Sequence, residues 1–170
     1  MALSFWKTFS PKLKRILLII FFFFLSLIVT IAGVLTPLSH DEAISINQEF
    51  EQALPDITLQ YIFGNNFMIC LIMFVPFAGP VFGFYALYNT GVIIAASSIA
   101  QYQSPIINFL FLVILPVFWL EFLAYSTAMS ESVWLIWRAI QHKGKKELMN
   151  ACILISFCAC LLYTSDAADE

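Results

Sequence analysis

One ionisable side chain lies inside a long apolar segment, and it is the first candidate for chemistry. Glu121 is the only charged residue between positions 106 and 130. Pro116 stands five residues before it, and a proline within a helix frees the carbonyl four residues earlier, here that of Leu112. We therefore expect a kink beside the carboxyl group. Such a carboxyl group is either a proton or ion ligand, or a protonated acid that hydrogen-bonds amides on neighbouring helices.

Three asparagines are candidate partners for this carboxyl group. Asn65 and Asn66 open one apolar segment, and Asn89 lies in the middle of the next. Side-chain amides hydrogen-bond across membrane helices, typically for about 0.6 kcal/mol. Asn89 begins an Asn-Thr-Gly triplet, which indicates either a helix irregularity beside a cavity or a polar clamp between packed helices. We predict an intramembrane polar site composed of Glu121, Asn65, Asn66 and Asn89.

The other reactive residue types form no catalytic or metal-binding pattern. The two histidines lie in polar connections, and the cysteines of the apolar runs lack the spacing of metal ligands. Glu131 follows Glu121 by ten residues, which separates the two carboxyl groups by about 15 Å along a helix and puts them on different faces. The sequence therefore predicts no enzyme, no metal site and no cofactor.

The composition indicates a membrane protein. Of the 170 residues, 61% are hydrophobic and 11% are charged, against roughly 45–50% and about 25% in soluble domains. These proportions exclude a soluble enzyme, a disordered chain and a basic nucleic-acid-binding protein. The fold class that we predict is all-α, a polytopic transmembrane helical bundle that forms one integral membrane domain over residues 1–159.

Apolar segments predict four complete spans and a truncated fifth. They cover residues 16–36, 61–77, 80–100, 106–130 and 148–159 onward. A span needs about 20 residues, so the uncharged run 61–101 is long enough for two. Pro76 and Pro80 mark a hairpin turn or a broken helix between them. A cleaved signal peptide is the alternative for the first segment, although its apolar core would be unusually long.

The basic residues predict the orientation. Four of them precede the first span, four follow the fourth, and the chain has no others. Basic clusters belong on the cytoplasmic side, so an even number of spans separates them. We predict a plasma-membrane protein with a cytoplasmic N-terminus and an external surface helix within residues 37–60, which carry five acidic residues and no basic one. Glu121, about 22 Å along its span, then falls in the cytoplasmic half.

Small residues recur at helical spacing and predict close helix packing. Gly79, Gly83 and Gly91 are separated by multiples of four residues, and Ala124 and Ala128 form a similar face in the fourth span. Packing within the chain explains both faces, and dimerisation is the alternative. The expected partners are the lipid bilayer and other membrane proteins or a second copy, without nucleic acid.

The last eleven residues, CLLYTSDAADE, resemble the in-frame translation of a transposase sequencing-library adaptor. We expect residues 160–170 to be a non-native tail, with the native sequence diverging near Cys160 and continuing the fifth span. A natural polar C-terminus is the alternative. Such a tail is left out of fold reasoning.

Three segments together resemble the stage II sporulation protein M family, whose members are multi-pass membrane proteins. They are IFGNN at 62–66, the stretch 79–91 that ends in Asn-Thr-Gly, and residues 116–124 with their proline and glutamate. The archaeal branch is most similar, through YNTG at 88–91 and LEFLAYS at 120–126. The chain departs from the family at Val117 and Phe118, where a His-Gly pair is common, so no role of that histidine carries over.

The resemblance implies a membrane component. In spore-forming bacteria the family member helps to anchor a peptidoglycan-degrading complex, which implies a non-enzymatic scaffold or complex subunit here without implying sporulation. The alternative is a transporter or channel-like protein that uses Glu121, because broken helices at membrane depth often line a substrate site. The matching residues are carried over as structural or site residues: Glu121, Asn65, Asn66, Asn89 and Gly91.

Overall fold

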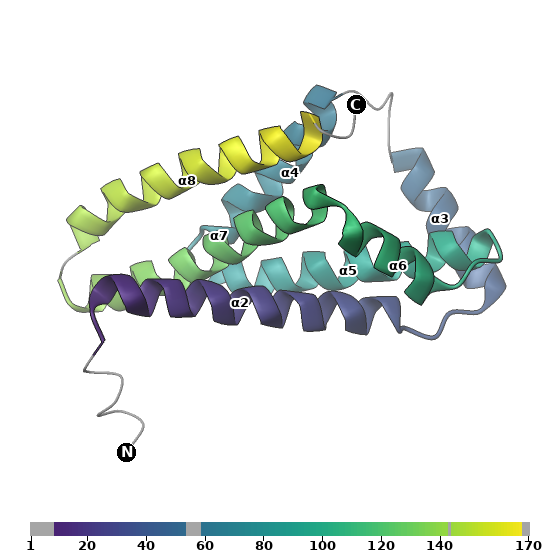
Figure 1. The fold of residues 1–170 in the computed structure, drawn as a ribbon, viewed down its shortest axis with the longest axis horizontal. Coiled ribbons are helices and arrows are strands. Elements are labelled where there is room, and N and C mark those ends of the chain that lie inside the picture. Colours follow the sequence, from purple (N-terminus) through teal and green to yellow (C-terminus); the bar gives the residue numbers. More distant parts are fainter. Residues whose placement is uncertain (1–8, 54–58, 143, 168–170) are drawn as a thin grey trace, which may run out of the picture.

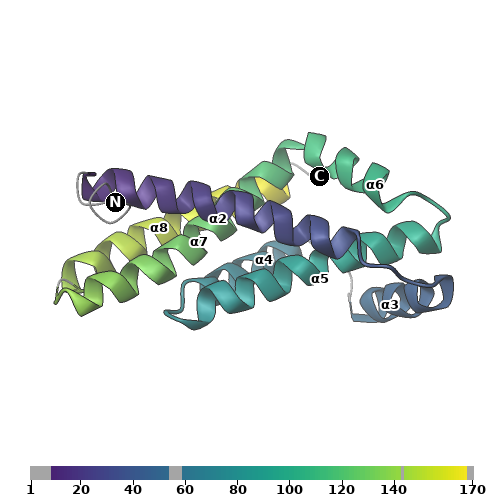
Figure 2. The same ribbon diagram turned by 90° about the horizontal axis from the view of Figure 1, so that it is seen from below.

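The computed structural model describes residues 9–53, 59–142 and 144–167, and these residues form seven helices and no strand. The all-α class is therefore confirmed. The helices are α2 (Pro11–Val34), α3 (His40–Ala53), α4 (Leu59–Met73), α5 (Ala78–Ala100), α6 (Pro105–Ile114), α7 (Pro116–Ile140) and α8 (Gly144–Ala167). They form one elongated bundle with α7 in contact with α2, α4, α5 and α8 (Figures 1 and 2).

The two ends of the bundle differ. One end, called here the basic end, holds the start of α2, the α4–α5 turn and the connection from α7 to α8, while α3 and α6 lie at the other end (Figure 1). At the basic end the Lys14 ammonium lies 5.8 Å from the centre of the Trp137 ring. The segments that carry the two clusters of basic residues thus lie at the same end, as the sequence predicts.

Local sequence accounts for where the polar helix begins. Ser39 and Glu42 form a capping box at the start of α3: the Ser39 N–H donates to Glu42 Oε2 at 2.9 Å, and the Glu42 N–H donates to Ser39 Oγ at 3.3 Å. The Ser39 N–H and hydroxyl hold the pKa of the exposed Glu42 below its ordinary value. The polar stretch 37–60 thus contains the helix that its pattern predicts.

Three of the described helices are long and apolar enough to cross a membrane: α2, α5 and the Glu147–Ser165 part of α8. The number of complete spans predicted from the sequence is therefore too high. The segment predicted at 61–77 is α4, whose 15 residues end at Met73, because the chain turns through residues 74–77 toward α5. That turn is a hairpin, and the Ser132 hydroxyl of α7 donates to its Val75 carbonyl at 2.7 Å.

The segment predicted at 106–130 is broken rather than kinked. α6 and α7 meet at Leu115 with a bend of 86°, and they make a fourth span only if the bent pair counts as one. Leu115 is extended, with φ −74° and ψ 135°, as the residue before a proline prefers. Carbonyls freed at the break are bonded again, since Leu112 accepts the Leu115 N–H at 3.0 Å and Val113 accepts the Trp119 indole N–H at 2.8 Å.

Helix α8 is one of the helices long enough to cross a membrane, and it continues through Cys160 to Ala167. Leu162 is fully buried, and the Ser165 hydroxyl donates to the Val117 carbonyl at 3.3 Å. The origin of residues 160–170 stays a prediction.

The small residues expected to pack between helices are all buried. A methyl group added at Gly91 would collide with the Thr30 carbonyl and lie 2.9 Å from the Cα of Gly33, so α2 and α5 cross with their backbones in contact. Gly79 and Gly83 lie against Met73 and Met129, and Ala124 and Ala128 of α7 are fully buried. Gly33, which forms the other side of the α2–α5 crossing, is not among the residues that the sequence singled out.

Candidate functional site

A cavity of about 500 Å³ lies between α4, α5 and α7 and is partly open, since several of its lining residues are exposed. Its lining includes all four residues of the polar site predicted from the sequence: Glu121, Asn65, Asn66 and Asn89. Phe50 of α3 and Leu112 of α6 also line it. The topology thus brings one carboxyl group and three amides from three helices to one space.

The four polar residues differ in their exposure and in their hydrogen-bond partners. Glu121 is half-buried, and Asn66 Nδ2 donates to its Oε1 at 3.4 Å, a long hydrogen bond. Asn89 Nδ2 donates at 2.7 Å to the carbonyl of Tyr85, one turn earlier in its own helix. Asn65 is exposed. α5 passes through Asn89 without interruption, so the irregularity considered there does not occur.

A second cavity of about 200 Å³ adjoins the first and shares Glu121 and Phe122 with it. It is lined by Thr30 of α2, Leu115 at the break, and the first residues of α7. Among the described residues that line the two cavities, Glu121 is the only charged one. The Glu121 carboxyl group therefore lies at the boundary between the two cavities, beside the break between α6 and α7.

The break shortens the distance of Glu121 from the start of its helix, and its depth in the membrane stays a prediction. The sequence places this residue in the cytoplasmic half because it counts residues from Ile106 along a straight helix. The 86° bend turns α6 away from the axis of α7, so only the residues after Pro116 count. Glu121 lies five residues, about 7.5 Å, into α7 and therefore near the end that holds α3 and α6.

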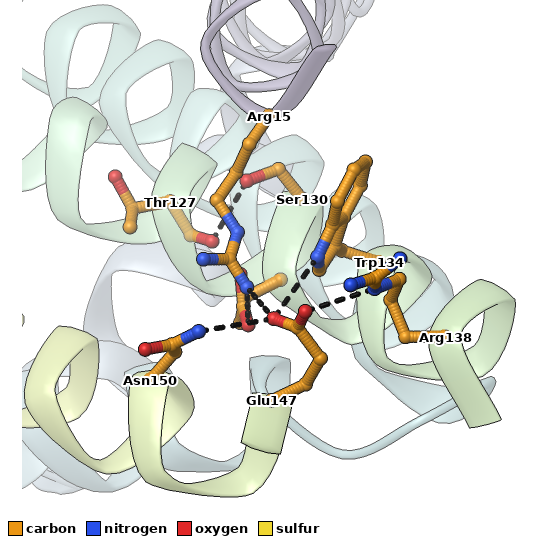
Figure 3. Close-up of polar contacts among 8 residues, drawn as sticks. Arg15, Thr127, Ser130, Trp134, Arg138, Glu147 and Asn150 are labelled. Atoms are coloured by element: carbon orange, nitrogen blue, oxygen red, sulfur yellow. Dashed lines mark hydrogen bonds and ion pairs between the residues drawn. The ribbon is translucent and has the colours of Figure 1, made fainter. Parts of the chain in front are cut away.

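The structure adds a second polar group that the sequence analysis missed, a charged cluster at the basic end (Figure 3). Arg15 Nη2 of α2 lies 2.8 Å from Glu131 Oε1 of α7 and 2.7 Å from Glu147 Oε2 of α8. Arg138 Nε lies 2.8 Å from the other oxygen of Glu147. Glu131 is fully buried and Glu147 is 6% exposed, so these are ion pairs of the interior.

Two uncharged side chains also belong to this cluster. We call it the Arg15 cluster, and its members are Arg15, Glu131, Trp134, Arg138, Glu147 and Asn150. The Trp134 indole N–H and the Asn150 amide donate to Glu147 Oε2 at 3.3 Å and 3.2 Å. The Arg15 and Arg138 guanidinium groups lie 5.3 Å and 5.8 Å from the Trp134 ring centre, within the range of cation–π attraction. The cluster thus joins the start of α2, the second half of α7 and the start of α8.

A local signal for part of the Arg15 cluster exists in the sequence. Glu131, Trp134 and Arg138 follow one another at spacings of three and four residues, which places them on one face of a helix. In the sequence, Glu131 stands out only by its distance from Glu121, and Arg15 only as one of the basic residues that mark the orientation. Nothing local connects Arg15 with Glu131, because 116 residues separate them.

Within the described residues, no group of three or more His, Cys, Asp or Glu side chains could hold a metal ion. No protein-family model, curated protein or solved structure matches the chain. Function is therefore inferred from the residues and their geometry.

Proposed function

We propose that this chain is a multi-pass membrane protein of the stage II sporulation protein M type that acts as a non-enzymatic scaffold or complex subunit. The observation that carries the proposal is that the charged groups of the Arg15 cluster form ion pairs with one another. Arg15, Glu131, Glu147 and Arg138 bond one another across three helices. Ion pairs that join three helices hold those helices in fixed positions, as a scaffold requires.

The packing supports a rigid body. The backbone contact between Gly33 and Gly91 locks α2 against α5, and the Arg15 cluster locks α2 against α7 and α8. The outer side of α2 is apolar: Phe21, Phe24 and Ile28 are each about 60% exposed and recur at helical spacing. Such a face suits lipid chains or the helices of a partner membrane protein.

The proposed location is the plasma membrane, with the N-terminus in the cytoplasm. The support is the common end of the two segments that carry the basic residues, because such clusters stay on the cytoplasmic side. Helix α3, which carries the four acidic residues Asp41, Glu42, Glu49 and Glu51, then lies outside the membrane.

The scaffold is tested by its complex. The full chain, tagged at the N-terminus and expressed at its native level, is extracted from the host membrane with a mild detergent and weighed by native mass spectrometry. We expect an assembly of fixed stoichiometry, and we expect Glu121→Gln to keep it, since the amide preserves shape and polarity. A wild-type chain that is recovered only as a monomer contradicts the scaffold.

A transporter or channel-like protein is the second candidate, and the cavity around Glu121 beside the broken α6–α7 pair favours it. This candidate predicts that Glu121→Gln folds normally and abolishes flux, because an amide cannot release a proton or neutralise a cation. The measurement is uptake of a radiolabelled amine into proteoliposomes that contain the purified chain. Equal uptake by protein-free liposomes contradicts transport of that probe.

A further inference from the structure

The charged residue in the lining of the Glu121 cavity determines which charge a bound ligand can carry. Glu121 is the only charged residue among those described in the lining of either adjoining cavity, and the other polar groups there are amides and hydroxyls. In a space of low polarity an anion is costly unless a cation or a proton neutralises it. A second anion is therefore disfavoured, and a positively charged ligand is favoured.

The walls of the cavity determine the polarity of the uncharged part of the ligand. Asn65, Asn66 and Glu121 make a polar side, whereas apolar side chains such as Ile69, Leu87 and Phe122 cover much of the remainder. The volume of about 500 Å³ lies within the range of about 300–1,000 Å³ that is typical of small-molecule sites. Phe50, Phe122 and Tyr125 also supply aromatic rings, which attract cations through their faces.

An inorganic cation suits this arrangement poorly. Ca²⁺ takes about 6–8 oxygen ligands at roughly 2.3–2.6 Å, and Mg²⁺ demands a near-octahedral set. The described lining offers one carboxyl group, and its asparagine side chains belong to two helices, α4 and α5, rather than to one compact ligand set. An ammonium group needs fewer partners, because it donates hydrogen bonds and its apolar body contacts the other walls.

We propose that the cavity around Glu121 binds a small organic cation, a primary ammonium group that carries an apolar or aromatic body. The ammonium group donates to the Glu121 carboxylate beside Asn66, and the body lies against the apolar wall. The proposal does not rest on the scaffold, and it names the ligand class for the second candidate while requiring binding only, without transport.

The test compares three matched probes on the full chain in nanodiscs of zwitterionic phosphatidylcholine, with empty nanodiscs as the blank. The probes are 2-phenylethylammonium, the neutral 2-phenylethanol and the anionic 3-phenylpropanoate, measured by isothermal titration calorimetry near pH 7. We expect the ammonium probe to bind at least tenfold more tightly than the other two. Absence of binding, or equal binding of the alcohol, overturns the proposal.

Variants locate the binding. Glu121→Gln is expected to weaken the ammonium probe at least tenfold, while Glu49→Gln, which removes an exposed carboxyl group of α3, leaves it unchanged. Ala86→Phe keeps the carboxyl group but fills the cavity that Ala86 lines, so it should abolish binding even if Glu121→Gln fails to fold. Unchanged affinity in Ala86→Phe, or in a folded Glu121→Gln, overturns the site.

These outcomes are separable from those of the proposed functions. Binding without uptake into proteoliposomes supports the ammonium site and contradicts transport of that probe. A stable complex in native mass spectrometry together with no binding supports the scaffold and overturns the ammonium site.

Discussion

Replacing Arg15 with leucine is expected to destabilise the bundle by about 3–5 kcal/mol, the cost of removing one partner from a buried ion pair. Arg15 Nη2 bonds both Glu131 and Glu147, at 2.8 Å and 2.7 Å. Glu131 is fully buried and loses the one cationic partner that the described residues give it, whereas Glu147 keeps Arg138. The Arg15 side chain is 21% exposed, so partial solvation brings the expected value toward the lower limit.

The assay is reversible unfolding in mixed micelles titrated with sodium dodecyl sulfate and followed by circular dichroism. Lys12→Leu is the matched control, because Lys12 is exposed on the same helix, and it should change the free energy of unfolding by less than about 0.5 kcal/mol. Adding Glu131→Leu to Arg15→Leu should recover part of the loss, since no unpaired carboxyl group then remains at position 131. Equal effects of Arg15→Leu and Lys12→Leu would refute the role of the cluster.

Three further predictions concern other parts of the chain. Gly91→Ala should cost about 1–3 kcal/mol in the same unfolding assay because the methyl group meets the backbone of α2, whereas Gly64→Ala, which has open space around it, should be neutral or stabilising; equal effects would argue against the close crossing. Glu121→Gln should be tolerated in unfolding, whereas Glu121→Leu should cost about 1–3 kcal/mol because it leaves polar partners unsatisfied; equal losses would contradict the hydrogen-bonding role. Long-read genomic DNA should diverge from the chain at or near Cys160, and finding the last eleven residues encoded there would end the adaptor interpretation.

Helices and the polar site could be anticipated because their signals are local. An uncharged run such as 16–36 has the length of a helix that crosses a bilayer, and α2 covers most of it. Pro76 and Pro80 interrupt the next run: the hairpin turn through residues 74–77 contains Pro76, and Pro80 lies in the first turn of α5. Glu121 stands out because a carboxyl group in an apolar segment is costly to place. Residues selected by this reasoning converge on one cavity.

What escaped prediction depends on contacts between distant segments. Pro116 predicts a lost hydrogen bond, but the 86° angle depends on how α6 packs against α5 and on the Trp119 indole that bonds the freed Val113 carbonyl. Because of this angle, Glu121 lies closer to the end that holds α3 and α6 than a straight helix from Ile106 would place it. Arg15 meets Glu131 only because α2 lies along α7, a pairing that no spacing in the sequence encodes.

The most direct test of the central claim, a membrane-spanning bundle with both basic segments on one side, is a pair of topology reporters. One reporter is fused after Gln141, between α7 and α8, and the other is inserted at Gln48 in α3. We predict that the first reads as cytoplasmic and the second as external. Both reporters on the same side of the membrane would contradict the arrangement.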